Sequence, residues 1–386
     1  MVIVKIFFWI ALFMLFWANI GYVLFILLLG KIIKRKNKKI YDYEPTVTVL
    51  VPAHNEEKII EEKLKNLISL DYPKDKLEIL ITSDHSTDKT NDIVKKFIKE
   101  NLEYKINLYE TKERKGKTNA QNEAISLINS EIIVMSDANA MIDKKAVREL
   151  VSSFSHENIA YVTGKLCYIN GDENQISDSE NTYWSLDTKI REIESNIQAV
   201  TAGNGAIYAC RTRNYVHINP IRGHDISMPF EYALQRKRAI ANHEAKAYEK
   251  AGETKDDEFK RKVRMNRGII RSIFMTLKIL NIFKYKWFTV FYLGHRTSRY
   301  LLWFNHILLL ITNMFLLKEG TLYSIVLYGQ LLFYILALIK QITKVNNKIL
   351  NIIYYYCMTI TAQFVGVYNA IRGKNKPFWE KAESTR

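Results

Sequence analysis

The chain has 386 residues, of which 48% are hydrophobic and 25% charged, and its formal net charge is +16. The apolar residues crowd both ends and the charges crowd the middle, which excludes a single soluble globule. Basic residues border the apolar stretches, which favours anionic lipid over nucleic acid as a partner, and the sequence carries no nucleic-acid-binding motif. The three cysteines, Cys167, Cys210 and Cys357, are widely separated, which argues against a disulfide framework or a zinc site.

The first apolar run covers residues 6–30 and contains no charged side chain. It is longer than the roughly 20 residues that a helix needs to cross a bilayer, and longer than a signal-peptide core. Six Lys or Arg residues follow within 31–39, and such clusters mark the cytoplasmic side of a span. We therefore expect residues 1–40 to form a transmembrane helix with a basic flank, its amino terminus outside.

Residues 41–268 are predicted to form a cytoplasmic α/β domain. Short apolar strands alternate with helical patterns, which indicates βαβ units and a mostly parallel sheet. The predicted strands are 46–51, 77–82, 106–110 and 131–136, and the predicted helices are 56–70, 90–100 and 118–128.

The carboxyl-terminal part is apolar again. Residues 269–285 mix apolar and basic side chains, so we expect segment 269–298 to contain an interfacial amphipathic helix, with a core helix as the alternative. Region 299–386 then holds three uncharged runs, each near or above spanning length. These runs are 300–317, 321–339 and 349–371.

The side of the membrane on which the tail lies is left open by the sequence. Lysines between the last two runs favour a cytoplasmic loop there, so strict alternation puts the tail outside. Its own basic charges favour the inside. One of the three runs is then re-entrant or interfacial.

Polar clusters follow three of the predicted strands. They are VPAHNEE at 51–57, SDHSTDKT at 83–90 and SDANA at 136–140. Ligands of doubly wound sheets bind at the carboxyl ends of the strands, so the three clusters are expected to face one crevice.

Two segments, one of them among these clusters and one outside them, have side chains that suit a diphosphate. Asp137 and Asn139 are two residues apart and point to the same side of an extended strand end, where they could hold a divalent ion or simply form a turn. Arg114, Lys115 and Lys117 surround Gly116 before a helix, which suits a phosphate or a solvated charged surface equally.

Together these motifs resemble the family-2 inverting glycosyltransferases with a GT-A fold. The resemblance is to the membrane-integrated synthases of cellulose, hyaluronan and poly-N-acetylglucosamine, and it covers about residues 46–268. RKGKTNAQNEA matches the family's Gly-Lys segment, and SDANA falls where the family carries its DxD. Further matches are TAGNGAIYACR at 201–211, GHDISMPFEYALQRKR at 223–238 and RKVRMNRG at 261–268.

The resemblance assigns roles to residues of this chain. Asp225 is expected to be the general base, although by itself it reads as a helix N-cap. Asp137 and Asn139 are expected to hold Mg²⁺ or Mn²⁺, and Gly203, Asn204 and Gly205 to bind the acceptor, although Asn204 between glycines is also typical of a tight turn. The nucleotide-sugar is expected to contact Pro52, Ala53, Asn55, Glu56, Ser83, Asp84, Lys117, Asp137, Ala138 and Arg264.

The chain departs from the family pattern at several of these positions. Ser83 stands where many members have an aspartate, Asn139 replaces the second DxD aspartate, and His224 precedes Asp225 where an acid is usual. Arg261 and Met265 replace the Gln and Trp of the QxxRW segment, which puts processive synthesis in doubt.

The sequence therefore predicts an inverting membrane glycosyltransferase that uses a UDP-sugar or similar donor and forms a β-linkage. The expected acceptor is a polysaccharide or glycan, with single transfer to a lipid-linked acceptor as the alternative. A non-catalytic membrane protein is the rival from another class.

Overall fold

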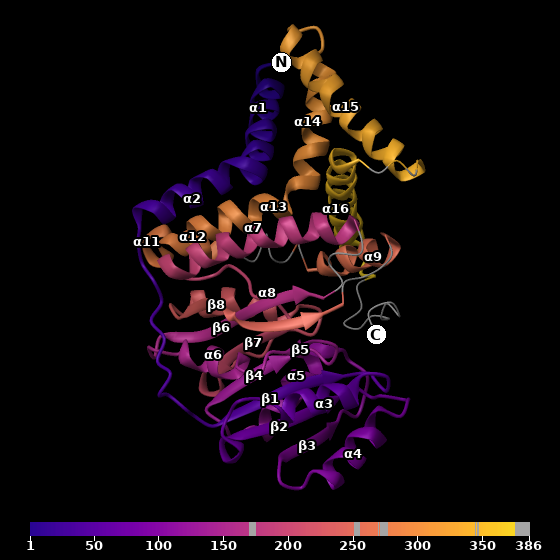
Figure 1. The fold of residues 1–386 in the computed structure, drawn as a ribbon. Coiled ribbons are helices and arrows are strands. Elements are labelled where there is room, and N and C mark those ends of the chain that lie inside the picture. Colours follow the sequence, from indigo (N-terminus) through magenta and orange to yellow (C-terminus); the bar gives the residue numbers. More distant parts are fainter. Residues whose placement is uncertain are drawn as a thin grey trace.

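The computed structural model describes residues 1–169, 175–250, 255–268, 270, 277–343, 345 and 347–374. Figure 1 shows an α/β domain at the bottom of the view and a bundle of long helices at the top. Between them lies a layer of helices that includes α7 (Gln175–Ile197) and the amino-terminal α2 (Tyr22–Ile32).

One eight-stranded sheet has the order β3-β2-β1-β4-β7-β6-β8-β5. The prediction of parallel pairing is confirmed for the first four strands. Beyond them the sheet is mixed, because β7 runs antiparallel to both β4 and β6, and β5 runs antiparallel to β8. The strands are β1 (Val47–Ala53), β2 (Leu77–Ser83), β3 (Lys105–Glu110), β4 (Ile132–Ser136), β5 (Met141–Ile142), β6 (Ile159–Tyr168), β7 (Ile207–Arg211) and β8 (Arg238–Glu249).

Helices cover both faces of this sheet. Alternate β1 residues Val47, Val49 and Val51 pack with α3, α4 and α6, whereas Leu50 packs in a second core with α5 and α8. Every residue of β1 is buried, as expected for a central parallel strand. The helices are α3 (Ile60–Ile68), α4 (Thr90–Glu100), α5 (Lys117–Ala124), α6 (Ala146–Ser152) and α8 (His224–Leu234).

The helix predicted at 90–100 has the observed bounds of α4. Two others are shorter than predicted. Residues 56–59 form a turn before α3, and α5 gives way to the 3₁₀ turn η3 (Ile125–Leu127).

Three helices are long and apolar enough to cross a membrane. They are Val2–Ile32, α15 (Thr321–Ile342) and α16 (Lys348–Ile371). The first consists of α1 (Val2–Phe16), the π-helix η1 (Trp17–Gly21) and α2, and it changes direction around η1 in Figure 1. These helices coincide with three of the four predicted apolar runs.

The fourth run, 300–317, is irregular. Its helix α14 (Leu302–Leu316) is only 15 residues long and continues from Trp287–Tyr300 across a bend of 62°. That preceding stretch consists of α12 (Trp287–Phe291), the π-helix η6 (Tyr292–Thr297) and α13 (Ser298–Tyr300). The pair is either one broken span or a re-entrant element, which agrees with the expectation that one run does not cross simply.

The segment before this bend is amphipathic in the part that is described. Residues 269 and 271–276 of the predicted helix 269–285 lie outside the described residues. The rest forms η5 (Leu277–Leu280) and α11 (Ile282–Tyr285). Ile279 and Tyr285 are buried against α8, whereas Phe283 is 92% exposed. An apolar exposed side opposite a packed side is the arrangement that suits a membrane surface.

Helix α16 packs closely on α9 (Lys255–Met265) and its C-terminal extension. The contact is made at Gly366, where an added Cβ would lie 2.9 Å from the Cβ of Asn266 and 3.2 Å from its carbonyl oxygen. Asn266 directly follows α9, so the close contact at Gly366 of the apolar helix α16 fixes the position of α9 against that helix.

We expect Gly366→Ala to lower the melting temperature in detergent, because overpacking against backbone costs about 1–3 kcal/mol. Gly329→Ala on α15 is the matched control, since nothing lies within 4 Å of its Cβ position. The control gains helix propensity and is expected to keep or raise the melting temperature. Equal behaviour of the two variants would contradict the close contact.

Candidate active site

The turns after β1 and β2 are tied to each other. Asn55, which has a left-handed φ of 53°, accepts a hydrogen bond from Thr87 N at 2.8 Å, and its own N–H donates to Ser86 Oγ at 3.2 Å. Asp88 accepts from Glu57 N at 3.1 Å. The first two predicted clusters therefore form one connected rim, as the sequence indicated.

Asp84 holds the Gly-Lys turn in place. Its two carboxylate oxygens accept from Lys115 N at 3.0 Å and Gly116 N at 2.9 Å, and the side chain is buried. Gly116 has a φ of 92°, a conformation that glycine adopts at little cost. Asp84 thus fixes the start of α5, and with it Lys117.

Lys117, Asp137 and Asp225 meet at Gly205. The Lys117 ammonium donates to Asp137 Oδ1 and to the Gly205 carbonyl, the latter at 3.3 Å. A Cβ on Gly205 would lie 3.2 Å from Lys117 Nζ, 3.6 Å from Asp137 Oδ2 and 3.8 Å from Asp225 Oδ2. One cation and two carboxylates therefore lie around the position that a larger side chain at 205 would fill.

Asp225 lies in the first turn of α8, whose N-cap is Gly223, so it is not the cap residue itself. The preceding His224 is buried and contacts Asn122 Oδ1 and Tyr215 Oη, each at 3.1 Å. Burial, with the charge of Lys117, lowers the pKa of His224 to about 3, so this ring is neutral at physiological pH. His224, the residue that stands in place of the usual acid, is therefore a neutral side chain that supports the turn at the start of α8.

The loop 203–205 is organised by its own polar groups. Asn204 Oδ1 accepts from Ala206 N and Ile207 N, each at 3.1 Å, and its amide donates to Gly164 O at 2.5 Å. Gly203 N donates to the Asp225 carbonyl at 2.8 Å. Asn204 shapes the turn, which is the alternative that the sequence offered for it.

The predicted metal ligands lie at the same edge. The Asn139 amide nitrogen donates to Glu249 Oε1 at 2.5 Å, which leaves its oxygen as the atom suited to a hard cation. Within the residues that the structure describes, no three His, Cys, Asp or Glu side chains form a closed metal cage. Asp137 is a single carboxylate, so a divalent ion here would be bound by it together with the phosphates of a substrate.

Two arginines after β8 interact electrostatically with carboxylates of the site. Burial, followed by the charges of Arg261 and Arg267, lowers the pKa of Arg264 to about 10, while Asp137 and Glu249 oppose that shift. Burial also lowers the pKa of Arg267, against the attraction of Asp225. Arg264, which the sequence predicted for the site, and Arg267, which it did not, are therefore both near enough to these carboxylates to interact with them electrostatically.

A buried lysine lies beneath the Asp137–Asn139 turn and was missed by the sequence interpretation. Lys63 of α3 is fully buried and donates to Ser136 Oγ at 2.7 Å and to the Ala140 carbonyl. Burial lowers its pKa to about 7, and the nearby Asp137 moderates that shift. Lys63 follows Ile60 by three residues and precedes Leu67 by four, so it lies on the apolar face of α3. That position was the signal in the sequence that could have indicated its burial.

The remaining residues that were predicted to contact the nucleotide-sugar lie at the strand ends. Their side chains are buried. This group consists of Pro52, Ala53, Glu56, Ser83 and Ala138. Ser83, at the position where many relatives carry an acid, donates to Ser86 Oγ at 2.9 Å and so holds the turn after β2.

The family model of glycosyl transferase family 2 matches residues 48–240, which is half of the chain. A probable glycosyltransferase of Bacillus subtilis, YdaM, is 41% identical over 130 residues, 33% of this chain and 30% of the relative. The β-monoglucosyldiacylglycerol synthase of a Nostoc strain is 31% identical over 170 residues, 44% of this chain and 36% of the relative. The chain thus aligns with about a third of each of these relatives.

Among solved structures, a mannosyltransferase from Pyrobaculum calidifontis, PcManGT, matches with a TM-score of 0.70. The match covers 96% of this chain and 99% of that one at 20% identity. That structure contains GDP-Man and Mn²⁺. The likeness shows a shared fold that includes the helices outside the α/β domain.

The lowered pKa of Lys63 predicts a pH effect on stability. Between pH 7 and its ordinary pKa of 10.5, the unfolded chain carries a Lys63 proton that the folded chain lacks. Stability is therefore expected to rise with pH in this window, by on the order of 3 kcal/mol between pH 7 and pH 9.5.

Lys63→Met is expected to remove this rise in thermal melts at the two pH values. Lys65→Met on the same helix is the control, because Lys65 is exposed and pairs with Glu61. A rise that persists in Lys63→Met would show that another group causes it.

Proposed function

The chain belongs to glycosyl transferase family 2, and from that premise we propose that it moves a sugar from a UDP-sugar, or a similar nucleotide-sugar, to a hydroxyl group of a glycan. The observation that carries this proposal is the convergence of Lys117, Asp137 and Asp225 around Gly205. A carboxylate that can accept a proton, close to a charge-neutralising group, suits displacement at an anomeric carbon.

Asp225 is proposed to take the proton of the attacking hydroxyl. Its backbone is fixed by the first turn of α8 and by the hydrogen bond from Gly203 N. Arg267 lies close enough to interact electrostatically with its carboxylate. Attack on an α-linked donor from the side opposite the diphosphate inverts the anomeric centre and gives a β-linkage.

The leaving diphosphate is proposed to bind at Lys117, Arg264 and the Asp137–Asn139 turn. Lys117 lies at the start of α5, where backbone N–H groups and the helix dipole also favour phosphate. A divalent cation, Mg²⁺ or Mn²⁺, held by Asp137 with the Asn139 oxygen, would neutralise charge on the diphosphate. Lys117 must then exchange part of its contact with Asp137 for the phosphate.

The nucleoside is proposed to lie on the rim formed by residues 53–57 and 83–88. Asn55 is exposed there and Glu56 is buried beside it. Asp84 is proposed to act on the donor through the Lys115–Gly116 turn, because both of its oxygens already accept from that backbone. Gly203 to Gly205 would border the acceptor on the opposite side.

The protein is proposed to be a multi-pass membrane protein with the domain 41–268 on the cytoplasmic side. The three apolar helices support membrane association, and the basic flank at 31–39 supports this orientation. Segment 269–298 is proposed to lie at the membrane surface and region 299–386 in the membrane, so membrane lipid is a constant partner.

Transfer of a single sugar to a lipid-linked acceptor is the second candidate function. It is favoured by the position of α8, which carries Asp225 and packs through Phe230 and Ala233 on the segment that exposes Phe283. An acceptor anchored in the bilayer surface would therefore find the proposed base on a helix that contacts the interfacial segment.

A donor screen tests the proposal and separates the two candidates. Protein in detergent with E. coli lipid extract is given UDP-glucose, UDP-N-acetylglucosamine or GDP-mannose with Mg²⁺ or Mn²⁺. We expect release of the nucleoside diphosphate from one donor, and loss of that release with EDTA. Sizing of the labelled product then distinguishes a chain of many sugars from a single sugar on lipid. Absence of release from all three donors would count against the proposal.

The site residues are tested by substitution. Asp225→Asn is expected to lower kcat by at least about 100-fold, because the amide cannot accept the hydroxyl proton. Asp137→Ala is expected to lower turnover and to raise the metal concentration required. Asp92→Asn on the exposed side of α4 makes the same chemical change outside the site and should leave turnover unchanged. Full activity of Asp225→Asn would refute its role as the base.

A further inference from the structure

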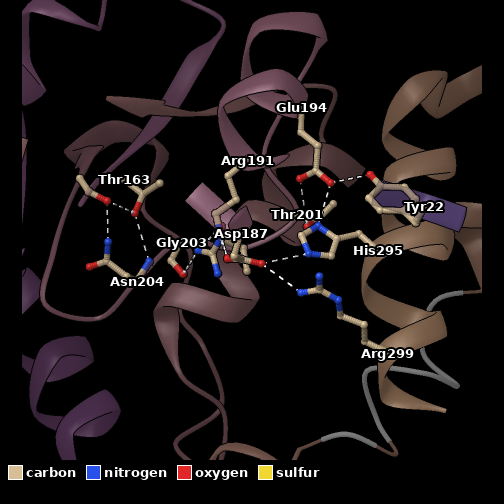
Figure 2. Close-up of polar contacts among 12 residues, drawn as sticks. Tyr22, Thr163, Asp187, Arg191, Glu194, Thr201, Gly203, Asn204, His295 and Arg299 are labelled. Carbon is tan, nitrogen blue, oxygen red and sulfur yellow. Dashed lines mark hydrogen bonds and ion pairs between the residues drawn. The ribbon is translucent and has the colours of Figure 1, made fainter. Parts of the chain in front are cut away.

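A buried ionic cluster lies outside the proposed site, where α7 meets η1, α2 and η6 (Figure 2). Asp187, Glu194 and His295 expose no more than 3% of their surface, so the cluster is shielded from water. Buried charges cost free energy unless they are paired, and here each has a partner. The members are Tyr22, Asp187, Arg191, Glu194, His295 and Arg299.

His295 joins the two carboxylates. Its Nδ1 lies 2.8 Å from Glu194 Oε1 and its Nε2 lies 3.2 Å from Asp187 Oδ1. Each ring nitrogen therefore faces one carboxylate oxygen. Burial would raise the pKa of Asp187, yet Arg191, His295 and Arg299 together hold it well below its usual range.

The membrane side of the cluster is built from two π-helical turns. Tyr22, which directly follows η1, donates to Glu194 Oε1 at 2.6 Å. Its ring stacks on His295 of η6 with centroids 5.4 Å apart. Gly294 permits this approach, because a Cβ there would lie 2.6 Å from the Tyr22 ring. The cluster therefore fixes the amino-terminal helix and η6 to each other and to α7.

The opposite side of the cluster holds the acceptor loop. Arg191 Nε donates to Asp187 Oδ2 at 2.6 Å, while its Nη1 donates to the carbonyls of Ala202 at 3.1 Å and Gly203 at 2.7 Å. Thr201 donates to Glu194 Oε2 at 3.4 Å. Residues 201–203 are thus attached to the cluster at three points.

The loop has little freedom to move independently of these contacts. A Cβ on Gly203 would lie 2.0 Å from the Tyr161 hydroxyl, so the backbone is pressed against β6. Gly203 N donates to the Asp225 carbonyl, and two residues later Gly205 borders Lys117, Asp137 and Asp225. A shift of Arg191 would therefore move the backbone that supports Asp225.

We propose that Arg191 and His295 are positioning residues for the transfer reaction, which set the place of the 203–205 loop and of Asp225 according to the packing of the amino-terminal helix and η6. This inference rests on the proposed function, in which Asp225 is the base. It makes the membrane helices part of the catalytic geometry, and it predicts loss of turnover without loss of nucleotide binding.

The decisive variant is Arg191→Lys in the full-length protein. Lysine keeps the charge beside Asp187, but its single nitrogen cannot also reach the carbonyls of Ala202 and Gly203. Gln198→Met is the matched control, because Gln198 directly follows α7 and its side-chain hydrogen bonds go to Tyr285 O and Phe288 N, in the segment before η6, rather than to the loop.

Turnover is measured with whichever of UDP-glucose, UDP-N-acetylglucosamine and GDP-mannose the wild type uses, and binding with Mn²⁺ and UDP or GDP. We expect Arg191→Lys to lower kcat about tenfold or more, with the Kd of the nucleotide unchanged and a melting temperature close to that of Gln198→Met. Gln198→Met should keep wild-type kcat. His295→Gln, which replaces the two ring nitrogens that face Glu194 and Asp187 with a single amide group, should resemble Arg191→Lys.

Wild-type kcat in Arg191→Lys, or an equal loss of kcat in Arg191→Lys and Gln198→Met, would overturn the inference and leave the cluster a purely structural contact. If Arg191→Lys does not fold, Tyr22→Phe decides instead. It removes one hydroxyl and keeps the stacked ring, and unchanged kcat would overturn the inference. Asp225→Asn is measured alongside: an active Asp225→Asn refutes the proposed function, whereas an inactive one beside an active Arg191→Lys refutes only this inference.

Discussion

The pairing of Ser136 with Ile207 is the contact on which the site depends. It joins β4, the last strand of the parallel half of the sheet, to β7, the first of the mixed half. Ser136 Oγ donates to Ala206 O at 3.0 Å, so residues 203–206 run beside Asp137 although about 70 positions separate them in the chain. Neither half of the sheet alone carries all of the candidate site residues. The parallel half supplies Lys117 and Asp137, and the mixed half supplies the glycine loop and Asp225.

The sequence predicts the parallel half well because its signals are local. β-Branched runs end at polar turns, and the carboxyl ends of parallel strands must meet at one edge. The mixed half gives weaker signals. β8 reads RAIANHEAKAYE, in which alanines alternate with charged residues, and its register with β6 shifts twice. Its strand conformation is stabilised by distant partners, which a local pattern cannot report.

The sequence also predicted which residues lie close together more reliably than it predicted the role of each residue. Asp84 and Asn204 were expected to contact substrates, yet both use their side chains to hold backbone N–H groups or carbonyls. Lys63 was missed, because its partner Ala140 is 77 positions away and a lysine that follows two glutamates is usually solvated. Residue type and strand-end position indicate where a site lies. Whether a given residue contacts the substrate or holds the backbone in place depends on tertiary hydrogen bonds.

The buried cluster of Asp187, Glu194 and His295 joins the α/β domain to the apolar helices at a high cost in desolvation free energy. Apolar side chains of similar volume would hold such an interface at least as tightly, because desolvation of charges consumes much of their attraction. What charged groups provide is a fixed direction, since a guanidinium binds carbonyls and carboxylates in a plane with defined angles. Arg191 uses that property on Ala202 and Gly203, the residues that lead into the loop beside Asp225. The cluster is therefore better suited to placing this loop than to strengthening the interface. Through the loop, it connects the packing of the apolar helices to the position of Asp225.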